Sequence, residues 1–214
     1  MKLLFLGNSH TYYNSMPDIV ARLLDATGVK VHVTMQTEGG KGLGYHAARA
    51  DVSFNIRHGH YDFIVAQDRS AGFEIGAFRE AVRLLKEHTD KASSSLCLYM
   101  PWTARDKREA QNDMTEAYLS VAKGLGCSLA PVGEVFTRLL RTVETDLLYR
   151  EDGNHTTPLG SYAAAVTIFY TVTGRKRILN VNDIKDPGAA LGISPEICQK
   201  IHEEACRASR LYNG

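Results

Sequence analysis

Three residues that lie far apart in this 214-residue sequence have the types needed to cleave an ester bond: Ser9, Asp152 and His155. A serine hydroxyl is a weak nucleophile until a base removes its proton, and histidine is the side chain suited to that task near neutral pH. A carboxylate on the other imidazole nitrogen fixes the tautomer and stabilises the imidazolium. Separately, Ser9 is also typical of a turn or helix cap, and the Asp152–His155 segment of a loop with a solvated histidine. Only the combination predicts a catalytic triad.

Attack on an ester carbonyl also needs hydrogen-bond donors for the negative charge that develops on oxygen. The backbone N–H of Ser9 is one candidate. Gly40 is a second, because no side chain obstructs a close approach to its N–H, and Gly39 is an equal rival since nothing in the sequence fixes the register. The side-chain amide of Gln67 is a third candidate. Loop flexibility alone would also explain the glycines, and a polar strand end would explain the glutamine.

The elements that must position these residues alternate along the chain. Leu3 to Leu6 is a continuous apolar run of the kind that is buried on both faces of a parallel sheet. Further strands are expected at 29–35, 63–66, 96–100 and 127–132. Helices are expected to begin near Ser15, which could cap the first of them, and then over 45–57, around 78–85, over 106–125, around 135–140, and over 158–173 and 194–211.

Strands separated by helices require right-handed crossovers, so we expect a mainly parallel sheet with helices on both faces. Ligand sites in such sheets lie beyond the carboxyl ends of the strands. Ser9 follows the first expected strand, Gly39 and Gly40 follow the second, and Gln67 ends the third. The candidate residues are therefore predicted to meet at one edge of a single domain that covers residues 1–214.

These residues together resemble a known family, the SGNH (GDSL-type) hydrolases. Phe5 to Thr11 resembles the first block of that family, with Gly-Asn-Ser in place of Gly-Asp-Ser, and Asp152-Gly153-Asn154-His155 resembles its last block, Asp-x-x-His. The glycine-rich loop at 38–44 is similar to the second block, whose glycine donates to the oxyanion hole. The third block departs from the family, since Gln67 stands where most members have an asparagine.

The resemblance implies an α/β fold, a three-layer α/β/α, flavodoxin-like sandwich around a mainly parallel five-stranded sheet. It also implies a serine esterase that needs no cofactor. Ser9, His155 and Asp152 would form the triad, and Ser9, Gly40 and Gln67 the oxyanion hole. Family members act on thioesters, lipids and acetylated sugars, so the expected substrate is a small-molecule carboxylic ester, for which an O-acetyl or short-acyl ester is one option. The alternative is a carbohydrate- or ligand-binding module that keeps the fold without hydrolysis.

Other chemistries have weaker support in the sequence. His10, His46, His58 and His60 could offer nitrogens to a metal, but no recognised ligand spacing occurs, so no metal is expected. The glycine loop lacks the order GxGxxG and does not follow the first strand, which disfavours a dinucleotide site. Trp102 follows the fourth expected strand and could either line an acyl or sugar pocket or cover the core.

Composition sets the remaining expectations. The chain has 25 Lys and Arg against 24 Asp and Glu, so no global basic field favours nucleic acid or an anionic membrane. No apolar segment is long enough to span a bilayer. Four scattered cysteines without a CxxC pair and the absence of a signal-peptide pattern favour a cytoplasmic location. The apolar helix around Ala163 to Tyr170 could contribute to a homodimer, although packing onto the domain's own core explains it equally.

Overall fold

A computed structural model of the protein describes residues 1–142 and 145–214. Its centre is a sheet of five parallel strands in the order β2-β1-β3-β4-β5. This is a doubly wound, flavodoxin-like order, so the predicted α/β fold is confirmed. The strands are β1 (Lys2–Gly7), β2 (His32–Thr37), β3 (Phe63–Gln67), β4 (Ser95–Tyr99) and β5 (Ser128–Ala130).

The central strands are apolar in their interiors because both faces of the sheet are covered. Along β1, Leu3 and Phe5 pack into the cluster on one face, whereas Leu4 and Leu6 pack into the cluster on the other. All four side chains are fully buried. Successive side chains of a strand point to opposite faces, so a continuous apolar run is what a doubly covered strand requires.

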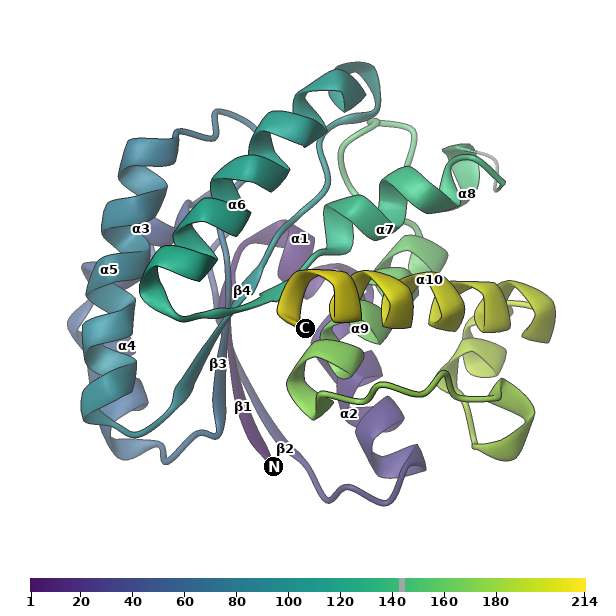
Figure 1. The fold of residues 1–214 in the computed structure, drawn as a ribbon, viewed down its shortest axis with the longest axis horizontal. Helices are drawn as coiled ribbons and strands as arrows, with labels where there is room; N and C mark the ends of the chain where they lie inside the picture. Colours follow the sequence, from purple (N-terminus) through teal and green to yellow (C-terminus); the bar gives the residue numbers. More distant parts are fainter. Residues whose placement is uncertain (143–144) are drawn as a thin grey trace.

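Helices form the two outer layers, which Figure 1 shows on either side of the sheet. One layer contains α3 (Leu43–Ala47), α4 (Ala50–His58), α5 (Ile75–Lys91) and α6 (Gln111–Leu125). The other contains α2 (Met16–Ala26), α7 (Val132–Leu139), α9 (Pro158–Thr173) and α10 (Pro195–Asn213). Short elements join them: α1 (Ser9–Tyr12), η1 (Tyr13–Ser15), η2 (Arg105–Ala110), α8 (Thr145–Leu148), η3 (Val181–Asp183) and η4 (Pro187–Leu191).

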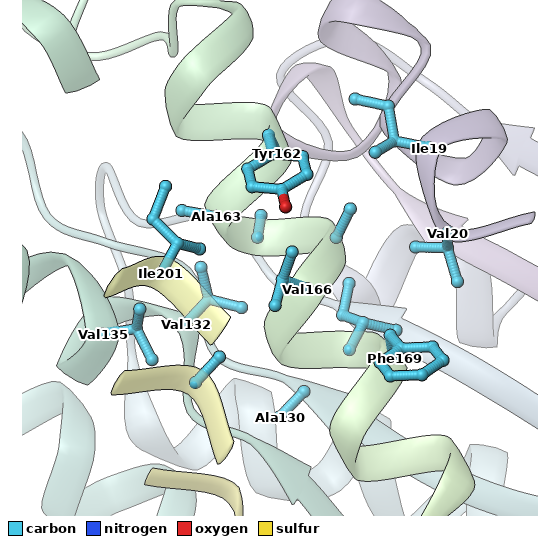
Figure 2. Packing of buried hydrophobic residues seen from close by; sticks show 14 of the residues in the cluster. Ile19, Val20, Ala130, Val132, Val135, Tyr162, Ala163, Val166, Phe169 and Ile201 are labelled. Carbon is cyan, nitrogen blue, oxygen red and sulfur yellow. The ribbon is translucent and has the colours of Figure 1, made fainter. Parts of the chain in front are cut away.

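Helix α9 is the core of the second layer. From Gly160 to Val172 it is buried around its whole circumference, because α2 packs on one side of it and α10 on another. Figure 2 shows Val166 and Phe169 of α9 between Ile19 and Val20 of α2 and Ile201 of α10. The predicted bounds 158–173 are confirmed, with Thr157 capping the first turn. No helix among the residues that the structure describes is long and apolar enough to cross a bilayer.

Several predicted boundaries are wrong for local reasons. The strand expected at 29–35 begins only at His32, because the Val29 N–H instead closes the end of α2 by donating to Leu24 O. The strand expected to reach residue 132 ends at Ala130, since Pro131 has no N–H to continue the ladder. Ser15 precedes α2 in a left-handed conformation and makes no side-chain capping bond.

Two expected helices are also divided. The helix predicted over 45–57 is α3 followed by α4, with Arg49 extended between them and bonded to Tyr45 and Asp51. The helix predicted over 106–125 is the 3₁₀ segment η2 followed by α6, and Lys107 has non-helical torsion angles at the break.

Candidate active site

Ser9 is held in place by the turn that follows β1. Asn8 caps α1: its side-chain oxygen accepts from His10 N at 3.0 Å, and its amide nitrogen donates to Lys41 O at 2.9 Å. Gly7 allows this turn, because a Cβ there would lie 2.4 Å from Thr11 Oγ1 and 2.6 Å from Gln67 Oε1. Ser9 thus becomes the first residue of a short helix, where a backbone N–H has no intrahelical acceptor.

The structure brings the three predicted triad residues together from opposite ends of the sequence. Ser9 Oγ lies 2.9 Å from His155 Nε2, and His155 Nδ1 lies 2.6 Å from Asp152 Oδ2. The other oxygen of Asp152 accepts from the backbone N–H groups of Asn154 and His155, both at 2.9 Å. Partial burial raises the pKa of Asp152, but the hydrogen bonds from His155 and the two amides outweigh it and lower the pKa to about 2. The carboxylate is therefore charged at neutral pH.

Aromatic rings surround His155 on two sides. The Tyr13 ring lies over the imidazole with a centroid separation of 4.4 Å, and the edge of His10 approaches at 5.7 Å. His10 in turn stacks on Trp102 at 4.5 Å. Burial and, as a smaller cause, the charge of His155 together lower the pKa of His10 to about 4, so His10 is neutral at pH 7.

Trp102 therefore belongs to the core and does not line a pocket. It is 1% exposed, and its indole N–H donates to Asn154 O at 2.8 Å. It also stacks on Phe136 at 4.5 Å. Trp102 thus braces the loop that carries His155, and the alternative that it lines an acyl or sugar pocket is wrong because the stacked rings of His10 and Phe136 help to bury the indole.

The glycine-rich loop after β2 lies close to Ser9, as the bond from Asn8 to Lys41 O shows. Gly40 has φ +69°, a left-handed conformation that favours glycine. A Cβ on Gly39 would lie 3.2 Å from the Tyr12 hydroxyl. The loop thus makes use of both glycines, Gly40 for its torsion angles and Gly39 for a close contact.

Gln67 lies at the end of β3, beneath the Ser9 turn. Its Oε1 accepts from Asn8 N at 3.1 Å and from Thr11 Oγ1 at 2.8 Å, and its Nε2 donates to Asp68 O. An N–H on one side and a carbonyl on the other fix the orientation of this amide. The side chain is fully buried, so Gln67 supports the Ser9 turn through Oε1, whereas its role as an oxyanion donor stays a prediction.

The four histidines considered as metal ligands lie apart. His46 is buried and its Nε2 binds Gly7 O at 2.8 Å, His10 stacks on Trp102, and His58 and His60 are exposed. Within residues 1–142 and 145–214, no group of three or more His, Cys, Asp or Glu side chains is arranged to hold a metal ion.

No protein-family model and no curated protein sequence matches the chain. A candidate SGNH hydrolase from Slackia heliotrinireducens is similar with a TM-score of 0.67 and 29% identity, covering 80% of this chain and 98% of its own. The chain has the SGNH hydrolase fold.

Two further structures share the SGNH hydrolase fold at lower identity. A DUF4886 family protein from Bacteroides uniformis has a TM-score of 0.78 and 18% identity, covering 99% of this chain and 95% of its own. An acetyl xylan esterase from Geobacillus stearothermophilus has a TM-score of 0.63 and 14% identity, covering 81% of this chain and 94% of its own.

Cavities lie on several sides of the candidate site on this SGNH hydrolase fold. An apolar cavity of about 520 Å³ reaches Asn154 and is lined by Phe73 among others. A more polar cavity of about 380 Å³ lies between the glycine loop and the end of β3 and is lined by Gly40 and Lys41 among others. A further cavity of about 870 Å³ is lined by Asp152 among others. Ser9 itself is half-buried.

Sequence reasoning missed the contacts by which Asn8 and Tyr13 support the site. Each acts on Ser9 or on the His155 loop through a contact with a residue distant in sequence. Only Asn8 carried a usable signal, since asparagine is a preferred N-cap residue and stands directly before the helical Ser9.

Proposed function

We propose that this protein is a serine esterase in which Ser9 is the nucleophile, His155 the general base and Asp152 the residue that orients His155. The observation that carries this proposal is the continuous hydrogen-bonded series from Ser9 Oγ to His155 Nε2 at 2.9 Å and from His155 Nδ1 to Asp152 Oδ2 at 2.6 Å. Both distances are within the reach required for proton transfer and for orientation of the base.

The reaction proceeds in two halves. His155 Nε2 accepts the proton of Ser9 Oγ as that oxygen attacks the acyl carbon, and the carbonyl electron pair moves onto oxygen. When the tetrahedral intermediate collapses, the bond to the leaving oxygen breaks and His155 returns the proton to it, releasing the alcohol. A water molecule then gives its proton to His155 and attacks the acyl-Ser9 ester, which releases the acid and restores the serine hydroxyl.

The oxyanion is bound by backbone N–H groups in this scheme. Ser9 N–H at the start of α1 and Gly40 N–H in the loop after β2 are the proposed donors. The bond from Asn8 to Lys41 O ties the two backbone segments together and so keeps both donors at a constant separation. Preorganised donors of this kind contribute about 3 kcal/mol each to transition-state stability.

The proposed substrate is a carboxylic ester of a small molecule with a short acyl group. Its support is the half-buried, accessible position of Ser9 and the similarity in fold to an acetyl xylan esterase. The polar cavity beside Gly40 and Lys41 suits a hydroxyl-bearing leaving group.

The test is hydrolysis of p-nitrophenyl acetate and of its longer-chain homologues with a chelator present. Wild type, Ser9→Ala and the matched control Ser53→Ala are compared, since Ser53 lies on α4 and its hydroxyl donates to the local carbonyl of Ala50. Activity in wild type and in the control that disappears in Ser9→Ala supports the proposal. The dependence of rate on chain length then measures the room available for the acyl group.

Two other outcomes would contradict the proposal. Equal activity in wild type and Ser9→Ala would remove Ser9 as the nucleophile. No hydrolysis by wild type, together with no labelling of Ser9 by a fluorophosphonate probe, would favour the non-catalytic binding module.

A further inference from the structure

We infer that Asn14 is a positioning residue that clamps the Ser9 turn to the loop that carries His155. The inference rests on the proposed function, because it concerns the alignment of Ser9 with His155. Asn14 lies in η1, five residues after Ser9, and its side chain reaches the segment that directly follows His155.

The side-chain amide of Asn14 makes both bonds of this clamp. Asn14 Nδ2 donates to Thr156 O at 3.1 Å and to Ser161 Oγ at 2.8 Å, across sequence separations of 142 and 147 residues. Thr156 is covalently attached to His155, and Ser161 lies in the first turn of α9. The two hydrogens of one amide group therefore hold both ends of the segment between His155 and α9.

The hydroxyl groups around Asn14 close a small network whose directions are determined. Ser161 Oγ has one hydrogen, which it donates to Tyr13 O at 3.3 Å because a carbonyl can only accept. Ser161 Oγ then accepts from Asn14, and Thr156 Oγ1, 2.8 Å away, is the donor in their contact. Thr156 and Ser161 are 1% and 2% exposed, so their polar atoms depend on these partners.

This network also controls the ring that covers His155. Tyr13 is the residue before Asn14, its carbonyl is bound by Ser161, and its ring lies 4.4 Å from the imidazole of His155. Asn14 thus acts on His155 from two sides, through the backbone of Thr156 and through the position of Tyr13.

The backbone at Asn14 explains why asparagine suits this position. Asn14 has φ 52° and ψ 26°, and Ser15 beside it has φ 51°, so two consecutive non-glycine residues are left-handed. Asparagine tolerates this conformation better than most residues, and such outliers persist where surrounding contacts hold them. Glycine would supply the torsion angles without the donors. Aspartate would supply similar torsion angles with a carboxylate that repels Thr156 O.

The experiment measures ester hydrolysis by Asn14→Gly, Asn14→Asp and Ser161→Ala. We expect Asn14→Gly to lower kcat about 10- to 100-fold with KM within about twofold of wild type, because a displacement of about 1 Å can cost about 100-fold. Asn14→Asp should lose at least as much, since it keeps the backbone preference but not the donors. Ser161→Ala should lose less, and its effect should be non-additive with Asn14→Gly because both belong to one network.

The matched control is Ser93→Gly. Ser93 is also a left-handed residue, with φ 55°, but it is exposed and lies before β4 at the opposite end of the sheet. Its kcat should equal that of wild type. Thermal unfolding of every variant shows whether it is folded, and if Asn14→Gly does not fold, Ser161→Ala decides the question.

The results separate this inference from the proposed function. Full kcat in Asn14→Gly or in Asn14→Asp, in an active wild-type background, would overturn the clamp and leave the triad intact. A wild-type protein that neither hydrolyses esters nor labels at Ser9 would overturn both.

Discussion

Two Asp–His pairs in the described part of the chain differ in what surrounds them. His155 Nδ1 lies 2.6 Å from Asp152 Oδ2, with the two side chains 22% and 48% exposed. His202 Nε2 lies 3.0 Å from Asp186 Oδ2, with exposures of 0% and 6%. The first pair lies at the edge of the sheet beside Ser9, and the second joins α10 to the segment before η4.

The remaining imidazole nitrogen separates the two pairs. In His155 it faces Ser9 Oγ, whereas in His202 it faces Tyr170 OH at 3.0 Å. Tyr170 OH also accepts from Leu179 N, and Asp186 accepts from Tyr162 OH and Gly188 N. Every polar group of the buried pair is thus used to hold the 179–188 segment against the two helices. A carboxylate–imidazole pair becomes a candidate catalytic unit only when a nucleophile and access to substrate accompany it.

The largest expected difference in activity comes from replacing each of the two histidines by alanine in a separate variant. His155→Ala should lower kcat/KM at least about 1,000-fold, because Ser9 loses its base, with little change in the free energy of unfolding. His202→Ala should leave kcat unchanged in the protein that remains folded. Ester kinetics and urea unfolding on both variants measure this contrast. A large loss of kcat in folded His202→Ala would break the distinction between the pairs.

Replacing Asp152, the acid of the exposed pair, should also lower activity, but by less than replacing His155. Asp152→Asn should lower kcat about 100- to 10,000-fold, because the amide no longer favours the productive tautomer of His155 or stabilises its charged form. The control is Asp183→Asn, an exposed acid in η3, which should behave as wild type. Unchanged kcat in Asp152→Asn would show that Asp152 is dispensable for orienting the base.

The buried pair should matter for stability. Asp186→Asn places an amide donor against the His202 N–H in a site that excludes water. This should lower the free energy of unfolding by about 2–3 kcal/mol. Thermal unfolding should therefore shift downward by several degrees, whereas kcat at 25 °C stays at the wild-type value. A Tm equal to that of wild type would contradict the role given to Asp186.

As the pH falls, the candidate site and the buried Asp186–His202 pair should lose their contributions to folding stability in different pH ranges. His10, beside the candidate site, has a pKa lowered from 6.5 to about 4, chiefly by burial, so its neutral form is favoured on folding. The stability it contributes is present above pH 6.5 and is lost as the pH falls toward 4, by up to about 3 kcal/mol. Burial also lowers the pKa of His46 and adds to the same loss.

The buried pair responds only at lower pH. Burial raises the pKa of Asp186, but hydrogen bonds from His202, Gly188 and Tyr162 reverse this and lower it overall. The contribution of Asp186 is therefore complete above about pH 4 and is lost below that value.

The test of the His10 titration is urea unfolding between pH 7 and pH 4. The free energy of unfolding should fall less over this range for His10→Phe, which keeps a ring on Trp102, than for wild type. If the free energy of unfolding changed with pH equally in His10→Phe and in wild type, protonation of His10 would not account for the loss.

Much of this protein was predictable from sequence because the deciding forces are local. A strand covered on both faces must be apolar in its interior, so 3–6, 63–66 and 96–100 were recognisable, and the largely apolar 158–173 was assigned its observed bounds. Serine, histidine and aspartate in a triad are required by their chemistry, so residue type alone made Ser9, His155 and Asp152 candidates.

Tertiary structure decided everything that depends on which distant groups meet. Gln67 ends β3 as predicted, but its hydrogen bonds with Asn8, Thr11 and Asp68 follow only from packing. Asn14 bonds to Thr156 and Ser161, which follow it by 142 and 147 positions in the sequence. His202 meets Asp186 only because α10 packs beside η4. A hydrogen bond requires positions accurate to a few tenths of an ångström, and packing of whole elements sets those positions. Residue types determined which chemistry was available, and packing determined which histidine could perform it.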